Sequence, residues 1–347
     1  MKKSLKLMTL LFIMGRVLLG SQLVGAQDKK TVMTTFYPVY FLTQKIAGDA
    51  MNVEMLLDDG QEAHGYEATA QDLVKIQDAD LFIYQDDEME FFVKDMINML
   101  DQKRTAVLES TKDIELLSGE GHDHGHDEAD HGHDEADHGH DEADHGHDEA
   151  DHGHDEADHG HDEVEHGHDE AEHNHEFDPH TWLDPEVYSQ QAENIKNALI
   201  ELDPANKATY EQNAKSLTEE LAKISQEYKE GLKDLDNRTI VVQHGAFGYL
   251  AHAFDLEQAS ITGLSTNQEP SAQTIAKMQE FMKETGNKVI FVDPSMKSDI
   301  SKTVGEATGA KLLPLRTLEI VTAEEMEKGL DYFTIMRDNL EVLKQNK

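Results

Sequence analysis

The pattern of apolar and polar positions in residues 31–109 alternates between two periods. Short β-branched or apolar runs are each followed by a stretch with apolar residues at helical spacing, which predicts strands joined by helices. The predicted strands cover 31–36, 52–57, 79–84 and 105–109, and the predicted helices cover 39–47, 71–78 and 89–100. Strands that alternate with helices form parallel βα units, and the loops at the carboxyl ends of their strands form the ligand crevice.

The same alternation returns in the second half, after two long helical patterns at 185–202 and 204–235. The second pattern would be about 45 Å long if fully helical. Beyond it, strands are predicted at 238–243, 257–261, 288–292 and 311–315, and helices at 272–285 and 323–345. The sequence therefore predicts an α/β protein with two Rossmann-like βα lobes, 27–202 and 236–347, joined by a rigid linking helix at 203–235.

Residues 1–26 have the pattern of a secretory signal peptide. Lys2, Lys3 and Lys6 precede an apolar run, and small residues precede Gln27, so we expect export to the periplasm or the cell surface. A lipoprotein signal would carry Cys where this chain has Ala26, and the chain contains no Cys. An ordinary signal peptidase would accept residues 24–26, and a Cys-to-Ala replacement is equally compatible with the sequence. Disulfides and thiolate metal sites are excluded.

A low-complexity tract, residues 121–176, interrupts the first lobe. It repeats HGHDEAD and holds 17 of the 21 histidines, mostly in pairs separated by one residue. A coiled coil is excluded because it needs two apolar positions in every seven. The composition predicts a disordered arm that collects zinc or similar ions through imidazole, with a solvated linker as the alternative. Because ordering such an arm costs backbone entropy, the tight site must lie elsewhere.

The charge of the chain limits its partners. The formal net charge is -41, and the chain keeps an acidic excess outside the tract. Nucleic acid is excluded as a partner because phosphate binding needs clustered Lys and Arg. Cations are the natural ligands of such a chain.

Four histidines lie outside the tract, and three of them are candidates for a tight metal site. His64, His180 and His244 occupy turn-rich or strand-end segments with the sequences EAHGYEAT, FDPHTWLDP and VVQHGAFGYL. A single loop histidine is more often exposed or capping than a ligand, but three beside a histidine-rich tract favour metal binding. His252 falls in an apparent helix and is interpreted as a surface residue.

These segments carry a resemblance to a known family. The stretches TTFYPVYFLTQKIAGD, FDPHTWLDP, HGAFGYLA, STNQEPSA and VIFVDPSM resemble the zinc-binding, substrate-binding components of bacterial ABC importers. This is the ZnuA/AdcA-like group of a larger family that also contains manganese-binding PsaA-like and TroA-like adhesins. The resemblance covers nearly the whole mature chain. It implies two lobes joined by a rigid helix, a metal ion between them, and delivery of that ion to a membrane permease.

The resemblance also implies a ligand set. His64, His180 and His244 match three ligands of the family, and Asp293 matches a strand end where zinc-binding relatives commonly have Glu. Glu62 or a water is the alternative fourth ligand. Three imidazoles and a carboxylate suit zinc better than manganese, which prefers oxygen. Asp178 and Asp184, on either side of His180, are expected to orient imidazoles or to cap the following helix.

The leading hypothesis is therefore an exported zinc-capture protein, and two alternatives stay open. One is a manganese-binding or adhesin-type member of the family, and the other is a zinc-dependent hydrolase with a water on the ion. We expect a monomer with no enzymatic activity, associated with the membrane through its permease.

Overall fold

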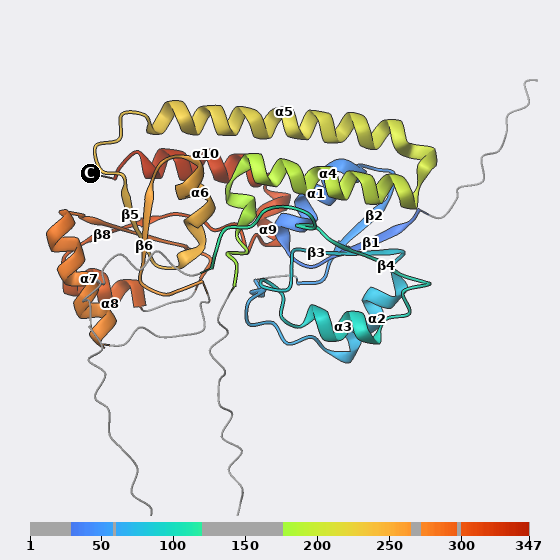
Figure 1. The fold of residues 1–347 in the computed structure, drawn as a ribbon, viewed down its shortest axis with the longest axis horizontal. Helices are drawn as coiled ribbons and strands as arrows, with labels where there is room; N and C mark the ends of the chain where they lie inside the picture. The colour runs from blue at the N-terminus through green and yellow to red at the C-terminus, as the bar shows by residue number, and fades with distance from the viewer. Residues whose placement is uncertain (1–28, 58–59, 120–175, 265–271, 297–299, 347) are drawn as a thin grey trace, which may run out of the picture.

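Two parallel sheets of four strands form the framework of the protein in the computed structural model (Figure 1). The structure describes residues 29–57, 60–119, 176–264, 272–296 and 300–346. The predicted signal peptide and all of the histidine-rich tract except residue 176 lie outside these ranges. The first sheet has the strand order β2-β1-β3-β4, and its strands are β1 (Thr31–Thr34), β2 (Asn52–Met55), β3 (Leu81–Tyr84) and β4 (Ala106–Glu109).

The second sheet repeats this topology with the order β6-β5-β7-β8. Its strands are β5 (Thr239–Val242), β6 (Glu257–Ser260), β7 (Val289–Val292) and β8 (Lys311–Pro314). All pairings in both sheets are parallel, because each strand returns through a βα crossover. The predicted fold class, two βα lobes, is confirmed.

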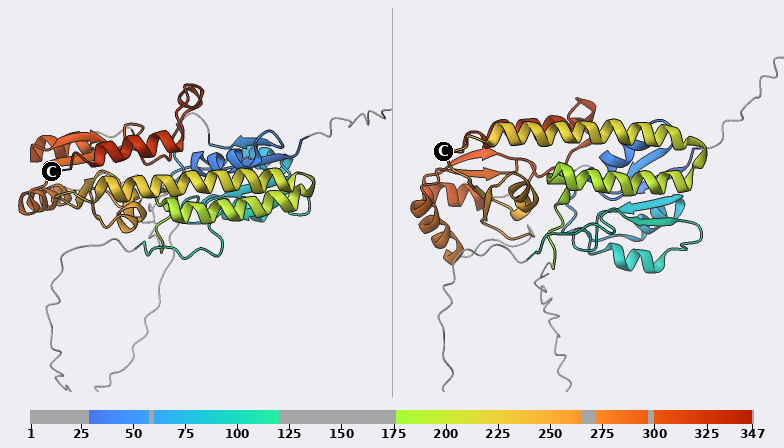
Figure 2. Two further views of the ribbon diagram at one scale, coloured as in Figure 1. Left: turned by 90° about the horizontal axis from the view of Figure 1, so that it is seen from above. Right: turned by 45° about the horizontal axis from the view of Figure 1, so that its top comes forward.

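Helices cover both faces of each sheet (Figures 1 and 2). The first lobe has α1 (Tyr37–Ala47), α2 (Ala70–Asp78) and α3 (Val93–Met99), and the second has α6 (Gly248–Ala253), α7 (Ala272–Thr285) and α8 (Ile300–Thr308). The C-terminal helices are α9 (Ala323–Glu327) and α10 (Tyr332–Leu343). No helix in the described part of the chain is long and apolar enough to span a bilayer.

Two antiparallel helices, α4 (Pro185–Leu202) and α5 (Lys207–Leu232), connect the lobes. Asp184 caps α4 by accepting a hydrogen bond from the backbone of Glu186 at 2.8 Å, as one of the two predicted roles for Asp184 requires. Helix α5 packs on α1 of the first lobe and on α10 of the second. One continuous apolar core extends from Val32 to Leu343, so the lobes share buried surface instead of meeting at a polar seam.

The structure differs from the predicted elements at two main points. The single helix expected at 323–345 is two helices, because Gly329 has a φ of 88° and Asp331 starts α10 as its N-cap. Helix α8 was not predicted.

Candidate metal centre

His64 lies in the loop that follows β2. Two residues later, the Tyr66 hydroxyl donates a hydrogen bond to Asp72 at 2.8 Å, and the Tyr66 ring packs edge-on against Phe92. Asp72 also completes a capping box with Thr69 at the start of α2. These contacts fix the chain beside His64, whose side chain is buried.

His180 lies in the short turn between the tract and α4. Its Nδ1 is 2.7 Å from Oδ1 of Asp178, and its backbone N–H donates to the same oxygen at 3.0 Å. Gln85, which directly follows β3, donates to the carbonyl of Pro179 at 2.9 Å and to the hydroxyl of Thr181 at 2.6 Å. The turn is therefore held on both sides of His180, and Asp178 orients the imidazole.

His244 follows β5 after one residue, and its Nδ1 lies 3.1 Å from the carbonyl oxygen of Gly263. The two glycines of the HGAFGYL segment are needed for close approach. A Cβ on Gly245 would lie 3.0 Å from that same oxygen, and a Cβ on Gly248 would lie 2.4 Å from Oδ2 of Asp178. The glycines thus make room for the groups that orient His244 and His180.

The fourth member of the cluster is Glu319, in the segment between β8 and α9. Among the described residues, one group has donor atoms close enough to share a metal ion, and it consists of His64, His180, His244 and Glu319. Glu319 was not predicted. A signal was present, since it is a lone acid between apolar residues just after a predicted strand.

Asp293, the predicted fourth ligand, is not a member of this group. Its Oδ2 accepts hydrogen bonds from the backbone N–H of Thr317 at 2.6 Å and from the Thr317 hydroxyl at 2.8 Å. Its Oδ1 accepts from the backbone N–H of Ser295 at 2.8 Å. Both oxygens of Asp293 are therefore engaged by residues outside the group. Glu62, the other alternative, is not a member of the group either.

The distances within the cluster fit a four-coordinate ion. Nε2 of His180 is 3.2 Å from Nε2 of His64 and 3.2 Å from Nε2 of His244. Oε1 of Glu319 is 3.5 Å from Nε2 of His180 and 3.3 Å from Nε2 of His244. Donors about 2.0–2.1 Å from a tetrahedral zinc ion are separated by roughly 3.3–3.4 Å. All four side chains are at most 5% exposed.

Hydrogen bonds at the outer nitrogens determine where the lone pairs point. A carbonyl only accepts, so Nδ1 of His244 carries the proton toward Gly263, and Nδ1 of His180 likewise donates to Asp178. In the neutral rings, both Nε2 lone pairs then face each other across 3.2 Å. Two lone pairs at that separation repel unless a cation or a proton lies between them.

The electrostatics of the cluster favour such a cation. Burial lowers the pKa of His180, but the carboxylates of Asp178 and Glu319 outweigh this effect and raise the pKa to about 9. Burial raises the pKa of Glu319, but His244, His180 and His64 outweigh it and hold the pKa well below its usual range. Neither oxygen of Glu319 receives a hydrogen bond within the described residues.

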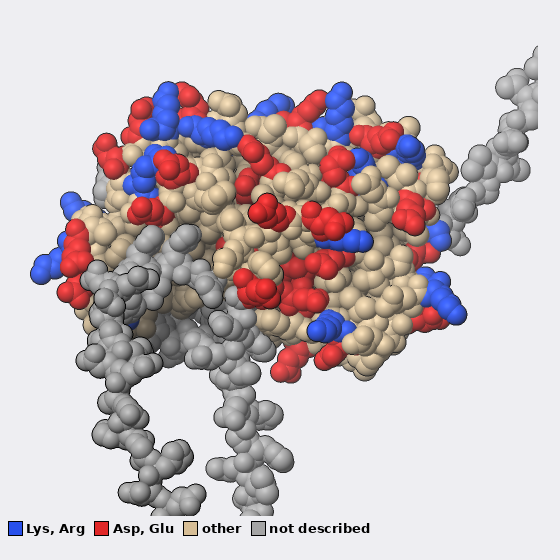
Figure 3. Space-filling model, in the orientation of Figure 1, with Lys and Arg blue, Asp and Glu red and all other residues tan. Residues whose placement is uncertain are grey.

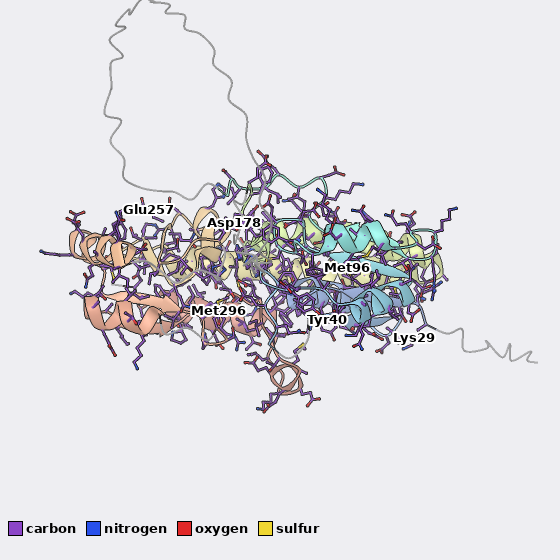
Figure 4. The ribbon with its side chains drawn as sticks, turned by 90° about the horizontal axis from the view of Figure 1, so that it is seen from below. Lys29, Tyr40, Met96, Asp178, Glu257 and Met296 are labelled. Atoms are coloured by element: carbon purple, nitrogen blue, oxygen red, sulfur yellow. The ribbon has the colours of Figure 1, made fainter. Side chains whose placement is uncertain are left out.

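A narrow surface cleft has Glu319 in its lining. Tyr37, Met55 and Leu57 line it from the first lobe, and Ile320 and Val321 line it from the second. Asp178, in contrast, lies where the described chain meets the tract (Figure 4). The ends of the tract are joined there, because Gly119 donates to the carbonyl of residue 176 at 2.8 Å.

The segment that carries Glu319 contains an unusual backbone conformation. Leu318 has a φ of 66°, in the left-handed region, which costs an L-residue roughly 1–2 kcal/mol. Such a conformation persists only where the neighbouring contacts hold it.

The protein has two similar lobes joined by a continuous helix, and three imidazoles and a carboxylate are buried between them. This arrangement is that of a two-lobed binding protein with a site suited to a metal ion. The chain belongs to the ZnuA family, whose model, described as zinc-uptake complex component A, periplasmic, matches residues 32–346. The family is a group of substrate-binding transport proteins, as the resemblance in the sequence indicated.

Relatives of known name support the same assignment. The chain is 37% identical over 344 residues to zinc-binding protein AdcA of Streptococcus pyogenes serotype M3, covering 99% of this chain and 61% of AdcA. It is 35% identical over 319 residues to high-affinity zinc uptake system protein ZnuA of Bacillus subtilis, covering 92% of this chain and 88% of that protein. The chain thus spans about three fifths of the AdcA relative.

Solved structures agree with this relationship. The Zn(II)-bound ZnuA-like domain of Streptococcus pneumoniae AdcA is 32% identical, with a TM-score of 0.68, covering 91% of this chain and 98% of that domain. The laminin-binding protein Lmb of Streptococcus agalactiae, described as bifunctional with adhesin and metal-transporting activity, is 30% identical with the same TM-score, covering 91% of this chain and 98% of Lmb.

Proposed function

We propose that this protein captures zinc outside the cytoplasm and delivers it to an ABC permease for import. The observation that carries the proposal is the convergence of His64, His180, His244 and Glu319, whose donor atoms lie within 4.8 Å of one another in a buried position. The zinc named in the AdcA and ZnuA relatives supports the same cargo.

The donor set favours zinc over manganese. Imidazole nitrogen suits zinc, whereas manganese prefers sites rich in carboxylate, carbonyl and water oxygen. Here one carboxylate faces three imidazoles, and the spacing suits four-coordination. A manganese-binding role, the alternative in the family, has less support from these residues.

We infer that the site binds an ion without doing chemistry on a substrate. A zinc hydrolase keeps a coordination position for the water that attacks the substrate. Four protein donors would fill a tetrahedral shell and leave no such position. The alternative of a zinc-dependent hydrolase is therefore disfavoured by the presence of Glu319.

An adhesin is the second candidate role. It is favoured by the likeness to Lmb, whose description combines adhesin and metal-transporting activity. Binding of the purified chain to laminin, compared between wild type and His180→Ala, would show whether adhesion exists and whether it needs the metal site.

We further propose the cellular setting of the protein. Residues 1–26 direct export, and the mature chain is a monomer. It works on the outer side of the membrane that holds its permease, in contact with that permease. The division into lobes at 27–202 and 236–347 around the segment 203–235 stays a prediction.

The mixed acidic and basic surface (Figure 3) offers no broad basic area for nucleic acid on the face that is shown.

Alanine replacement of single ligands tests the proposed site. Zinc bound by four protein ligands has an apparent free energy of roughly 10–16 kcal/mol, so losing one ligand should weaken binding by roughly 100-fold or more. We expect this for His64→Ala, His180→Ala and His244→Ala in competition with a chelator. His252→Ala is the matched control, because His252 is exposed on α6. Equal affinities for all four variants would show that the site is misassigned.

The transport role needs a separate experiment in cells. We expect that a strain lacking the gene grows poorly in zinc-depleted medium, that the wild-type gene restores growth, and that the His180→Ala variant does not. Normal growth of the deletion strain would argue against import.

A further inference from the structure

We propose that Asp293 is a positioning residue that holds Glu319 in the metal centre by fixing Thr317. This inference rests on the proposed function, since it assumes that Glu319 binds the ion. It assigns a role to a buried carboxyl group that is not a member of the cluster.

Glu319 differs from the histidines in how it is held. His180 and His244 have Asp178 and the Gly263 carbonyl at their outer nitrogens. The Glu319 carboxylate receives no hydrogen bond within the described residues. Its close contacts are with imidazoles of the cluster itself, at 3.3 Å to His244 and 3.5 Å to His180, so outside the cluster its position depends on the backbone that carries it.

Thr317 lies two residues before Glu319, and its position in that backbone is fixed by hydrogen bonds. Asp293 accepts both its N–H at 2.6 Å and its hydroxyl at 2.8 Å. The Thr317 oxygen Oγ1 in turn accepts the N–H of Glu319 at 3.4 Å. Two donors on one carboxylate oxygen fix the backbone and the χ1 angle of Thr317 together. Asp293 thus determines the orientation of the group that holds the Glu319 amide.

The left-handed Leu318 makes this anchoring necessary. A leucine leaves that region unless both of its flanks are held. On the far side, the Arg316 guanidinium donates to the carbonyl of Ile320 at 3.1 Å and pairs with Glu325 at 2.8 Å. On the near side, Asp293 supplies the corresponding anchor. The Trp182 indole holds the Thr317 carbonyl as well, but only Asp293 holds the Thr317 N–H and hydroxyl, so its loss loosens the support of Leu318 and Glu319.

Thr317 also contacts the first lobe. Its carbonyl accepts a hydrogen bond from the Trp182 indole at 2.7 Å, and Trp182 lies two residues beyond His180. The segment with Glu319 and the turn with His180 are therefore joined by a direct hydrogen bond. On the Asp293 side, the Met296 N–H donates to the Asp293 carbonyl at 3.2 Å.

The test uses cobalt(II) as a spectroscopic probe in the full-length chain, with a chelator present that outcompetes the weak sites of the tract. Four-coordinate cobalt absorbs visible light more strongly than five- or six-coordinate cobalt. We would compare wild type, Glu319→Gln, Asp293→Asn and the double variant. Asp331→Asn is the matched control, because Asp331 accepts the N–H and the hydroxyl of Thr334 in the same way at the start of α10.

We expect Asp293→Asn to weaken cobalt binding by roughly 10–100-fold, the range for loss of an outer partner. Its visible spectrum should change in the same direction as that of Glu319→Gln. The double variant should bind no more weakly than Glu319→Gln alone, because both changes remove one interaction. Asp331→Asn should keep the wild-type affinity and spectrum.

Two results would overturn the inference. One is a wild-type spectrum and affinity in Asp293→Asn, and the other is a loss that adds fully to that of Glu319→Gln. If Asp293→Asn does not fold, Thr317→Val removes the same hydroxyl contacts and must reproduce the spectral change. Failure of wild type to bind one tight ion would instead contradict the proposed function.

Discussion

The imidazole of His180 is fully buried between two carboxylates, so its charge is set by its neighbours. With its pKa raised to about 9, the metal-free protein holds a proton in the cluster at neutral pH. That proton occupies the place of a cation, since it can lie on Nε2 beside Glu319. Zinc must displace it to bind.

This leads to a prediction of proton release. Below pH 9, zinc binding should release roughly one proton, and the apparent affinity should rise roughly tenfold per pH unit until the pH reaches the pKa. Calorimetric titrations in buffers with different ionisation enthalpies would measure the number. No proton release at pH 7.5 would show that the His180 imidazole is neutral in the metal-free protein.

The same raised pKa affects the stability of the metal-free protein. The folded state binds the proton more tightly than the unfolded state, whose histidine pKa is about 6.5. The stabilising contribution is therefore complete below pH 6.5 and is lost as the pH rises through about 9.

At the scale of the elements, α10 fastens the second lobe to the first. Tyr332, its first residue, is fully buried, stacks on Phe41 of α1 and donates a hydrogen bond to the carbonyl of Trp182 at 2.8 Å. Tyr188 of α4 packs against the same ring, with a centroid distance of 4.7 Å. Helix α10 of the second lobe is thus joined directly to the segment of the first lobe that carries His180.

Tyr332→Phe tests this bridge. The change leaves the buried Trp182 carbonyl without its donor, so the free energy of unfolding should fall by about 1–3 kcal/mol. Denaturant titration of the metal-free protein would measure it. Tyr210→Phe is a suitable control, because its partner Asp203 keeps a hydrogen bond from Asn206. A loss no larger than in this control would show that the bridge contributes little.

At the scale of the whole molecule, the residues on either side of the histidine-rich tract pair with each other. Its flanks pair through an isolated antiparallel bridge between Ser118 and Phe177, and Asp178 donates to the Leu117 carbonyl at 2.9 Å. Because the ends already meet, the segment between them can be replaced by a short turn.

Deleting residues 121–176 should therefore lower the number of zinc ions bound while leaving one tight ion and a cooperative fold. Metal analysis after equilibrium dialysis would count the ions, and a tract with all histidines changed to Ser is the control for length. Ions held by the tract should be released as the pH falls through about 6.5. Loss of the tight ion in the deletion variant would mean that the tract belongs to the core.

The shared core and the continuous α5 also limit movement between the lobes. Tyr228 on α5 donates to the Met336 carbonyl at the second lobe, and Asn213 donates to the Ile46 carbonyl at the first. Closure by a large hinge would bend α5 and break these contacts.

We therefore predict that metal-free and zinc-bound forms differ mainly near His64, His180 and Glu319, with little rotation of the lobes. Hydrogen exchange should slow on zinc binding in those segments and stay unchanged in α4 and α5. A large zinc-dependent change in overall dimensions of the tract-deleted protein, measured by solution scattering, would contradict this.

The sequence by itself determined the order of the eight strands, most of the helices and the three histidines. Periodicity is a local property, so apolar alternation identified the strands without knowledge of their partners. Parallel connection then placed the strand ends at one edge of each sheet. His64, His180 and His244 could be found because each lies in a turn or at a strand end with a distinctive local sequence.

Only the tertiary structure decided the fourth member of the cluster. Asp293 and Glu319 both follow strands, β7 and β8, which are neighbours in one sheet, so the sequence places two carboxylates at the same edge. Which one turns inward depends on Thr317, whose donors engage Asp293, and on the left-handed Leu318 beside Glu319. Hydrogen bonds between residues 24 positions apart and a single unusual φ leave no periodic trace along the chain, and for that reason the choice between the two acids could be made only in three dimensions.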